Sequence, residues 1–364
     1  MNKKPTPEQK RNEFRKRWYG EAVLTVLSFF YGAAVSVRGF LYRSGFFKSK
    51  KLPVPVICFG NLSAGGTGKT SAVIAAAVML SEAGFHPAVI LRGYKRKAPA
   101  KRLTILAADS SFDRAEAGDE ACLIYQTLGR NCAGVFVCAD RFAAGEAAVK
   151  HSADLILMDD GFQHLSVGRD ADIVLVNAAD PFTGDRLLPY GNLREKPSGL
   201  KRASAVILSH CEQASEEEIA ALKKAVSEIN PSVPVLTSLH EMKCFVRPGE
   251  PGSLPLSCMA GRRAVALSAI GDPVSFEKSL GVLGVNLEQR WRYPDHHFFT
   301  RTELNSLKNA KGGLPVITTA KDFERFPEDW MKFIGEELYI LAVSMTFREN
   351  GAGALLDLIK SRTK

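Results

Sequence analysis

The hydrophobic and polar positions along the chain alternate in a way that is typical of a parallel sheet with helices packed on it. Short apolar runs rich in β-branched residues predict strands at 54–60, 87–91, 135–138, 155–158, 173–176 and 206–208. Longer segments between them, at 68–83 and 139–150, predict helices. Because strands joined by helices of this length run parallel, we expect an α/β fold in which helices cover both faces of the sheet.

A second, smaller α/β series follows a stretch at 247–257 that is rich in Pro, Gly and Ser and predicts a loop. Its pattern predicts strands at 264–269, 316–319 and 338–343, and helices at 276–283, 302–309 and 353–359. We therefore expect an N-terminal segment at 1–50, a larger domain at 51–240 and a smaller domain at 241–364. The smaller domain would close an active-site cleft against the larger one.

The N-terminal segment contains an apolar run at 22–37 that carries no charge and is apolar on every side of a helix. Sixteen such residues fall short of the roughly 20 that span a bilayer. Both flanks are basic, so the positive-inside rule defines no outer side. We predict a helix inserted into the cytoplasmic face of a membrane, as in a peripheral or monotopic protein. The alternatives are a signal peptide, a full span and a helix packed on the rest of the chain.

The net charge of +9 belongs to this N-terminal segment. Residues 1–51 hold 12 Lys and Arg and three Glu, whereas the remaining 313 residues hold 36 basic and 36 acidic side chains. A neutral body disfavours nucleic-acid binding across it. The seven Cys are scattered without metal-binding spacing, which favours reduced thiols in a cytosol-facing protein over a disulfide framework.

The clearest chemical signal is the segment GNLSAGGTGKT at 60–70, which follows a predicted strand and opens a predicted helix. Such a loop binds phosphate through its backbone N–H groups and the helix N-terminus. Ser63 stands where the usual pattern has Gly, and a purely structural Gly-rich turn is the alternative. The residues that we expect to bind a nucleotide are Ser63, Ala64, Gly65, Gly66, Thr67, Gly68, Lys69 and Thr70.

Within this loop, Lys69 would reach the β- and γ-phosphates and the Thr70 hydroxyl would bind Mg²⁺. Asp159 and Asp160 end the apolar run at 154–158, where nucleotide-binding folds place the carboxylate that directs the metal. We expect one of the two to serve Mg²⁺ and the other to orient the loop or the nucleophile. A capping turn is the alternative. His164, in the same DDGFQH string, fits a packed residue as well as a functional one.

Two further strings carry candidate acid–base residues. Asp119, in GDE at 118–120, precedes an apolar helix and by itself favours an N-cap. YPDHHFF at 293–299 places His296 beside an aspartate, which is a modest signal for acid–base work. Arg92, Lys95, Arg96 and Lys97 form a basic cluster that would face an anionic group or solvent.

In this order the motifs resemble the tetraacyldisaccharide 4′-kinases, also called lipid A 4′-kinases. Besides the apolar N-terminal helix and the 60–70 loop, the resemblance rests on LRGY (91–94), GDE (118–120), ADR (139–141), DDGFQH (159–164), LLPYGNLRE (187–195), SAIGDP (268–273), YPDHH (293–297) and TTAKD (318–322). The resemblance covers nearly the whole chain and implies a P-loop NTPase-type sheet.

The resemblance also implies a reaction: transfer of the γ-phosphate of ATP, with Mg²⁺, to the 4′-hydroxyl of an acylated glucosamine disaccharide 1-phosphate. It implies that Asp119 is the catalytic base and that His296 assists it, which overrides the N-cap interpretation although capping and catalysis remain compatible. We also expect Lys69 to serve catalysis, because its charge should strengthen its hold on phosphate oxygens as the transition state forms. We expect the chain to act as a monomer.

Two other functions remain alternatives at this point. A nucleotide-hydrolysing switch that binds guanine would need the motifs N-K-x-D and D-x-x-G. The nearest candidates here have the wrong spacing, because Lys321 and Asp322 are adjacent and Asp160 directly precedes Gly161. A non-catalytic membrane adaptor would not need Asp119. ATP turnover without a lipid acceptor would indicate the switch, and tolerance of Asp119→Ala would indicate the adaptor.

Overall fold

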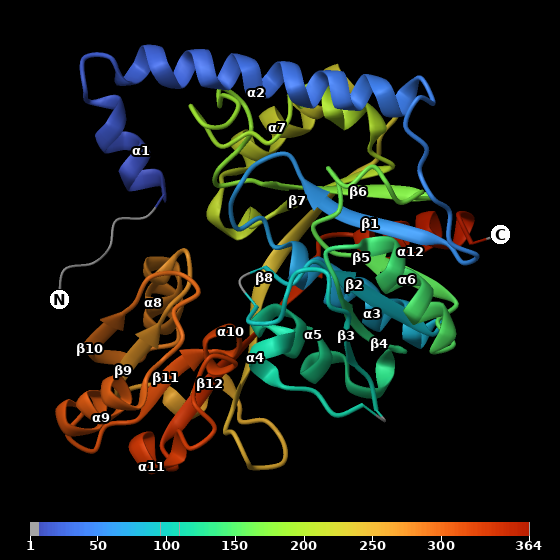
Figure 1. Cartoon of the computed structure of the whole chain (residues 1–364). Coiled ribbons are helices and arrows are strands. Elements are labelled where there is room, and N and C mark those ends of the chain that lie inside the picture. The colour runs from blue at the N-terminus through green and yellow to red at the C-terminus, as the bar shows by residue number, and fades with distance from the viewer. Residues whose placement is uncertain (1–6, 95, 109, 364) are drawn as a thin grey trace. The chain divides into compact units, whose positions relative to one another are not determined.

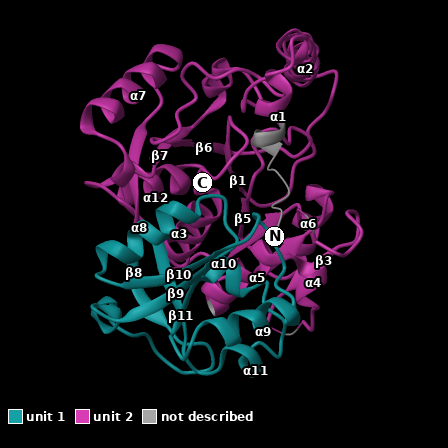
Figure 2. Ribbon diagram, turned by 90° about the vertical axis from the view of Figure 1, so that its left-hand side faces the viewer, with its two compact units in different colours: residues 1–6, 241–344 teal, residues 7–240, 345–364 magenta. Residues whose placement is uncertain are grey.

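The computed structural model describes residues 7–94, 96–108 and 110–363, with the side chains of all of these except residues 7–10 and 130. These residues form two compact units, which Figure 2 distinguishes by colour. Unit 1 is Glu241–Ser344. Unit 2 is Pro7–His240 together with the C-terminal segment from Met345.

Unit 2 is built on a parallel sheet whose strands follow the order β8-β7-β6-β1-β5-β2-β4-β3. The short edge strand β3 runs antiparallel to β4, whereas the other pairings recorded within this unit are parallel. The strands are β1 (Val56–Asn61), β2 (Pro87–Leu91), β3 (Thr104–Leu106), β4 (Gly134–Val137), β5 (Leu155–Met158), β6 (Ala171–Asn177), β7 (Ala205–Ser209) and β8 (Val235–Val246).

Helices cover both faces of this sheet, as the sequence predicts. Alternate residues of β1 point to opposite faces, so that Ile57 packs into one apolar core with α3 and α5 while Cys58 packs into another with α6. A third core lies beneath α7. These helices are α3 (Lys69–Glu82), α4 (Arg114–Ala117), α5 (Asp119–Leu128), α6 (Arg141–Lys150) and α7 (Glu216–Ile229).

The C-terminal helix α12 (Gly351–Ser361) belongs to unit 2, which differs from the domain boundary expected at 241–364. Its buried residues Leu355 and Ile359 complete the apolar core around α3. One boundary between the units falls inside β8, directly after His240, and the other falls inside β12. The apolar N-terminal helix also clusters with unit 2 instead of forming a part of its own.

Unit 1 has its own parallel strands in the order β10-β9-β11-β12. Side-chain caps define several of its helices: Asp272 accepts the Ser275 N–H, and Thr300 forms a capping box with Glu303. The elements are α8 (Pro273–Val282), α9 (Arg301–Ala310), α10 (Ala320–Phe323), α11 (Met331–Ile334), β9 (Arg263–Ser268), β10 (Asn286–Arg292), β11 (Val316–Thr319) and β12 (Leu338–Phe347). Across the two units, short 3₁₀ turns occur at Gly129–Asn131, Pro197–Arg202, Cys211–Gln213 and Leu256–Met259.

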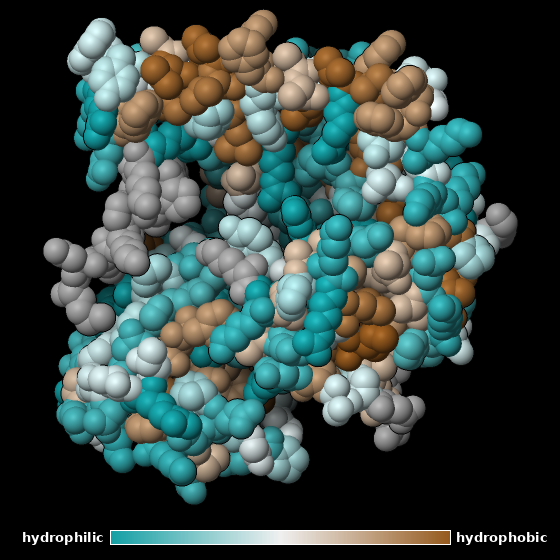
Figure 3. Space-filling model, viewed as in Figure 1, coloured by the Kyte–Doolittle hydropathy of each residue, from teal (hydrophilic) through white to brown (hydrophobic). Residues whose placement is uncertain are grey.

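Two helices precede the sheet of unit 2: α1 (Pro7–Arg15) and α2 (Gly20–Arg43) (Figure 1). One face of α2 packs on the body of the unit, where the Ser28 hydroxyl donates to the Leu187 carbonyl at 2.7 Å and the Tyr31 hydroxyl donates to the Arg194 carbonyl at 2.9 Å. The other face exposes a row of large apolar side chains, visible in Figure 3. By length and composition α2 is able to cross a membrane.

Candidate active site

The phosphate loop connects the buried central strand β1 to α3, as its sequence predicts. Gly68 is the N-cap of α3 and has a φ of 73°, a left-handed conformation that favours glycine. At Gly65 and Gly66 an added Cβ would meet no atom within 4 Å, so the backbone of this part of the loop is open to a ligand. This geometry presents the α3 N-terminus and nearby N–H groups to an anion.

Neighbouring strand ends hold the loop in place. The Asn61 side-chain amide donates to the Thr67 hydroxyl at 3.0 Å, and the Ser209 hydroxyl at the end of β7 donates to the Thr67 carbonyl at 3.0 Å. On the other side, the Ala64 N–H donates to the Asn192 carbonyl at 2.7 Å. The loop conformation is therefore fixed by contacts within unit 2.

The two residues that open α3 each contact one member of the acidic pair. The Thr70 hydroxyl donates to Asp159 Oδ2 at 3.2 Å, and Lys69 Nζ lies 3.6 Å from Asp160 Oδ1. Asp160 is also paired with Arg194, whose guanidinium lies 2.7 Å from the same Oδ1. The pair left open by the sequence is thus divided: Asp159 accompanies Thr70, and Asp160 joins two cations.

This division follows from the backbone. Asp159 directly follows β5, which pairs with β1, so its side chain meets the start of α3. Asp160 has a φ of 48° and turns away from the strand direction. Burial would raise the pKa of Asp160, but Lys69 and Arg194 outweigh it and lower that pKa, so this carboxylate is ionised at neutral pH.

Asp159 is the residue of the pair that fits a Mg²⁺ site. It is buried, and its Oδ1 has no hydrogen-bond partner among the described residues. Burial, Glu120 and Asp160 raise its pKa to about 7 against the opposing effect of Lys69. A hydroxyl and an unpartnered carboxylate oxygen are the donors that Mg²⁺ prefers, so Thr70 and Asp159 fit the ion.

Asp119 is the first residue of α5 and is only 6% exposed. The N-cap position belongs to Gly118, which corrects the N-cap interpretation of Asp119. Its neighbour Glu120 is one of the charges that raise the pKa of Asp159. The catalytic role of Asp119 stays a prediction.

His296 lies in unit 1, in the loop that follows β10, with a φ of 64°. Its Nδ1 lies 3.1 Å from an Arg325 guanidinium nitrogen, and its Nε2 lies 3.7 Å from Asp295 Oδ2. Because arginine can only donate, Nδ1 accepts, and the neutral ring carries its proton on Nε2. Buried Arg325 also donates to the Ala269 carbonyl at 2.8 Å, which fixes the ring's orientation. The partnership of His296 with Asp119 stays a prediction.

Two other sequence interpretations gain a structural answer. Arg96, expected in a basic cluster, is buried and donates to the Thr104 hydroxyl and to the Val137 carbonyl, so it supports the fold around β3 and β4. Arg92 and Lys97 are exposed, and Lys95 lies outside the described residues. His164 contacts the Ser166 hydroxyl at 3.0 Å, and burial with nearby arginines lowers its pKa to about 4, which favours the packed interpretation.

Sequence reasoning missed two arginines of the site. Arg194 reaches Asp160 from 34 residues further along the chain, within the string LLPYGNLRE. Arg141 is 3% exposed and donates to the carbonyls of Cys138 and Asp159, and burial lowers its pKa to about 10. The ADR motif at 139–141 marks Arg141 as a candidate, but the sequence does not indicate that Arg141 contacts the Asp159 carbonyl.

Comparisons with known proteins identify the family of this sequence. The model of the family described as tetraacyldisaccharide-1-P 4′-kinase (LpxK) matches residues 20–361. A tetraacyldisaccharide 4′-kinase from Elusimicrobium minutum is 39% identical over 94% of this chain and 91% of its own length. One from Anaeromyxobacter dehalogenans is 36% identical over 85% of this chain and 82% of its own.

A solved structure gives the same answer. The crystal structure of LpxK from Aquifex aeolicus, an "apo" form in complex with ATP, matches with a TM-score of 0.74 at 31% identity. The match covers 94% of this chain and 99% of that one. The chain belongs to the tetraacyldisaccharide-1-phosphate 4′-kinase family.

Proposed function

We propose that this chain transfers the γ-phosphate of ATP to the 4′-hydroxyl of a tetraacylated glucosamine disaccharide 1-phosphate. Its family makes it an ATP-dependent kinase of lipid A biosynthesis. In the reaction, the 4′ oxygen forms a bond to the γ-phosphorus while the bond from that phosphorus to the β,γ-bridging oxygen breaks. The products are ADP and the 4′-phosphorylated lipid A precursor.

The phosphate loop of unit 2 would hold ATP. Its open backbone at Gly65 and Gly66 and the N-terminus of α3 would accept the phosphates, with Lys69 on the β- and γ-oxygens. Thr70 and Asp159 would hold Mg²⁺, which when bound neutralises charge on the β- and γ-phosphate oxygens. Arg194 shares Asp160 with Lys69, which leaves the ammonium group partly available for phosphate.

The acceptor hydroxyl needs a group that takes its proton. We assign this role to Asp119, which is buried at the start of α5 and whose neighbour Glu120 is among the charges that raise the pKa of Asp159. His296 would orient or tune this carboxylate through its protonated Nε2. General base assistance of this kind is worth roughly 10²–10⁴ in rate.

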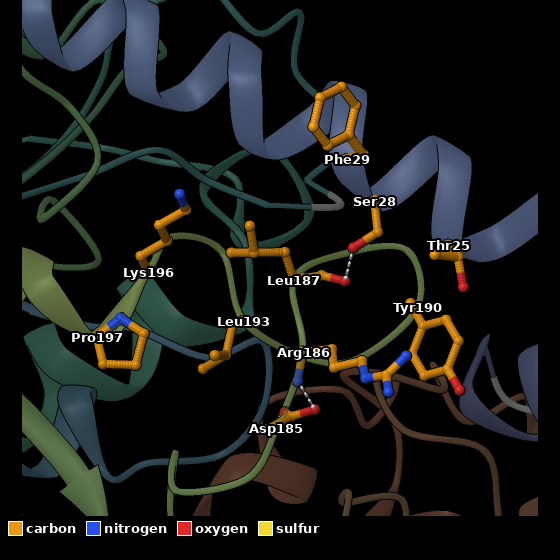
Figure 4. A pocket seen from close by; sticks show the side chains of 10 residues that line it. All are labelled: Thr25, Ser28, Phe29, Asp185, Arg186, Leu187, Tyr190, Leu193, Lys196 and Pro197. Atoms are coloured by element: carbon orange, nitrogen blue, oxygen red, sulfur yellow. Dashed lines mark hydrogen bonds between the residues drawn. The ribbon is translucent and has the colours of Figure 1, made fainter.

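The acceptor is a lipid, and the outer face of α2 offers a surface for meeting it. Phe29, Phe30 and Phe40 are each more than 60% exposed on this helix. An apolar pocket of about 340 Å³ lies between α2 and the segment 185–197, with Arg186 and Lys196 in its lining (Figure 4). We propose that α2 lies in the cytoplasmic face of the inner membrane with this pocket at the lipid level.

One observation carries the proposal: Thr70 and Lys69 at the start of α3 face Asp159 and Asp160 at the end of β5. A single chain supplies all of these groups, and we propose that it acts as a monomer. The test is incubation of the full-length protein with Mg-ATP and the disaccharide 1-phosphate lipid in detergent. Mass spectrometry should detect one added phosphate, located at the 4′ position.

The adjacent aspartates provide a matched pair of variants for the metal site. Asp159→Asn should raise the Mg²⁺ concentration needed for half-maximal activity at least tenfold, because it removes a charged oxygen ligand. Asp160→Asn should change this concentration far less, since its carboxylate pairs with Lys69 and Arg194. Equal effects would overturn the division of roles, and failure of wild type to phosphorylate the lipid would overturn the function itself.

A further inference from the structure

A cluster of two histidines and one glutamate lies beside the phosphate loop and has no role in the reaction described above. His210 follows β7, Glu212 lies in the next 3₁₀ turn, and His240 lies in β8, so the cluster joins two neighbouring strands of unit 2. The potential ligand atoms of the three side chains all lie within 4.8 Å of one another.

Hydrogen bonds and ring stacking hold the three side chains beside one another. The His240 backbone N–H donates to Glu212 Oε2 at 3.1 Å, while Glu212 Oε1 lies 3.4 Å from His210 Nδ1. The two imidazole rings stack with centroids 4.0 Å apart and planes at 11°. His240 Nδ1 is buried and has no hydrogen-bond partner among the residues that the structure describes. A buried polar atom without a partner calls for one that is not part of the chain.

The donor set selects the class of ion. Two imidazoles and a carboxylate suit Zn²⁺ and similar divalent transition ions, whereas Mg²⁺ prefers oxygen ligands and retains water. Bonds of 2.0–2.2 Å in a tetrahedral site place ligands about 3.4 Å apart. Binding therefore requires exposed Glu212 to rotate and one of the two stacked imidazoles to turn out of the stack. We propose that His210, Glu212 and His240 bind Zn²⁺ or an ion of the same class, separately from Mg²⁺ at Thr70 and Asp159.

The position of the site gives the ion a structural effect. A Cβ added at Gly68 would lie 2.8 Å from His240 Cε1, which shows how closely the ring approaches the end of the phosphate loop. Ser209, next to His210, donates to the Thr67 carbonyl. A bound ion therefore ties the end of β7 and β8 together around the residues that open α3, and it stabilises the folded state by mass action.

The test uses the full-length protein in detergent, purified without a polyhistidine tag, stripped with a chelator and titrated in excess Mg²⁺. Zn²⁺ should bind at one equivalent and raise the melting temperature. Co²⁺ should give the intense visible d–d bands of a four-coordinate site, without the charge-transfer band of a cysteine thiolate. Cys211 adjoins His210 in the sequence. A charge-transfer band would show that a cysteine thiolate binds the ion, which would overturn the assignment of the ligands.

Variants then identify the ligands. Loss of a residue that only contacts a metal ligand weakens metal binding by about 10–100-fold. Loss of a ligand itself should weaken it more, so His210→Gln and Glu212→Gln should each lower the Zn²⁺ affinity by more than this. The exposed His86 provides the control His86→Gln, which should leave binding unchanged. Melting temperatures of the chelator-treated variants should match that of wild type, which separates lost binding from misfolding.

Two results would overturn the proposal. The first is Zn²⁺ affinity that Glu212→Gln and His210→Gln leave unchanged. The second is loss of ATP affinity in these variants with no change in Zn²⁺ binding, which would assign the cluster to the nucleotide instead. Both readouts are independent of phosphoryl transfer to lipid, so the proposal stands or fails apart from the kinase reaction.

Discussion

Membrane binding through the outer face of α2 can be tested by replacing three phenylalanines that pack little against the protein. Phe29, Phe30 and Phe40 are 71%, 64% and 61% exposed. The triple variant Phe29→Gln, Phe30→Gln and Phe40→Gln keeps good helix formers along α2. We expect it to fold as wild type and to bind membranes far more weakly.

The exposed fractions set the size of this loss. Complete burial of a Phe side chain is worth about 1.5–3 kcal/mol. With roughly two-thirds of each ring available to the membrane, the three residues contribute about 3–6 kcal/mol to membrane binding. Since 1.4 kcal/mol is a factor of ten in an equilibrium constant, the partition coefficient should fall at least a hundredfold.

The assay is sedimentation with vesicles that contain anionic lipid, at fixed salt, because the basic flanks of α2 add an attraction that salt screens. Val282→Gln is the control, since Val282 is 80% exposed but lies on α8 of unit 1. This control should bind as wild type. Equal membrane binding by the triple variant would refute the proposed orientation of α2 and would require another surface for the contact.

Three further predictions concern the site and the fold. Lys69→Ala should lower kcat by about 10²–10³ with a smaller change in the KM for ATP, because it removes a charge that stabilises the transition state; a change in KM alone would contradict this. Asp119→Ala and His296→Ala should each lower the kcat for phosphate transfer by about 10²–10⁴. The kcat of the double variant should fall far less than the product of the two single losses. If the losses multiply, the two residues do not act jointly. Gly60→Ala should destabilise unit 2 by about 3 kcal/mol in denaturant unfolding, because its Cβ would lie 2.4 Å from Phe162 Cβ; unchanged stability would contradict this packing.

Local pattern was enough to predict the elements that bind phosphate. The strand expected at 54–60 is β1 (Val56–Asn61), and the helix expected at 68–83 is α3 (Lys69–Glu82). Both depend on strong local signals, a β-branched apolar run and a Gly-rich loop before a helix. The edge strand β3, only three residues long, had too short a pattern to be recognised.

Features that depend on contacts distant in sequence could not be predicted. The division of Asp159 and Asp160 depends on a left-handed backbone at Asp160, which tertiary packing fixes. Arg194 reaches Asp160 through the fold of the 185–194 segment. The periodicity near 353–359 indicated a helix but not which sheet it covers, and α12 packs on α3 in unit 2.

Phosphorylation of a 4′-hydroxyl by this site is tested most directly by measuring ADP release with matched acceptors. The full-length enzyme is given Mg-ATP with the disaccharide 1-phosphate lipid, with the same lipid already phosphorylated at the 4′ position, or with no lipid. We expect one ADP for each new 4′-phosphate with the first acceptor and no release above background with the others. Equal ADP release in all three reactions would contradict this expectation, because the site would then hydrolyse ATP without transferring phosphate to the lipid.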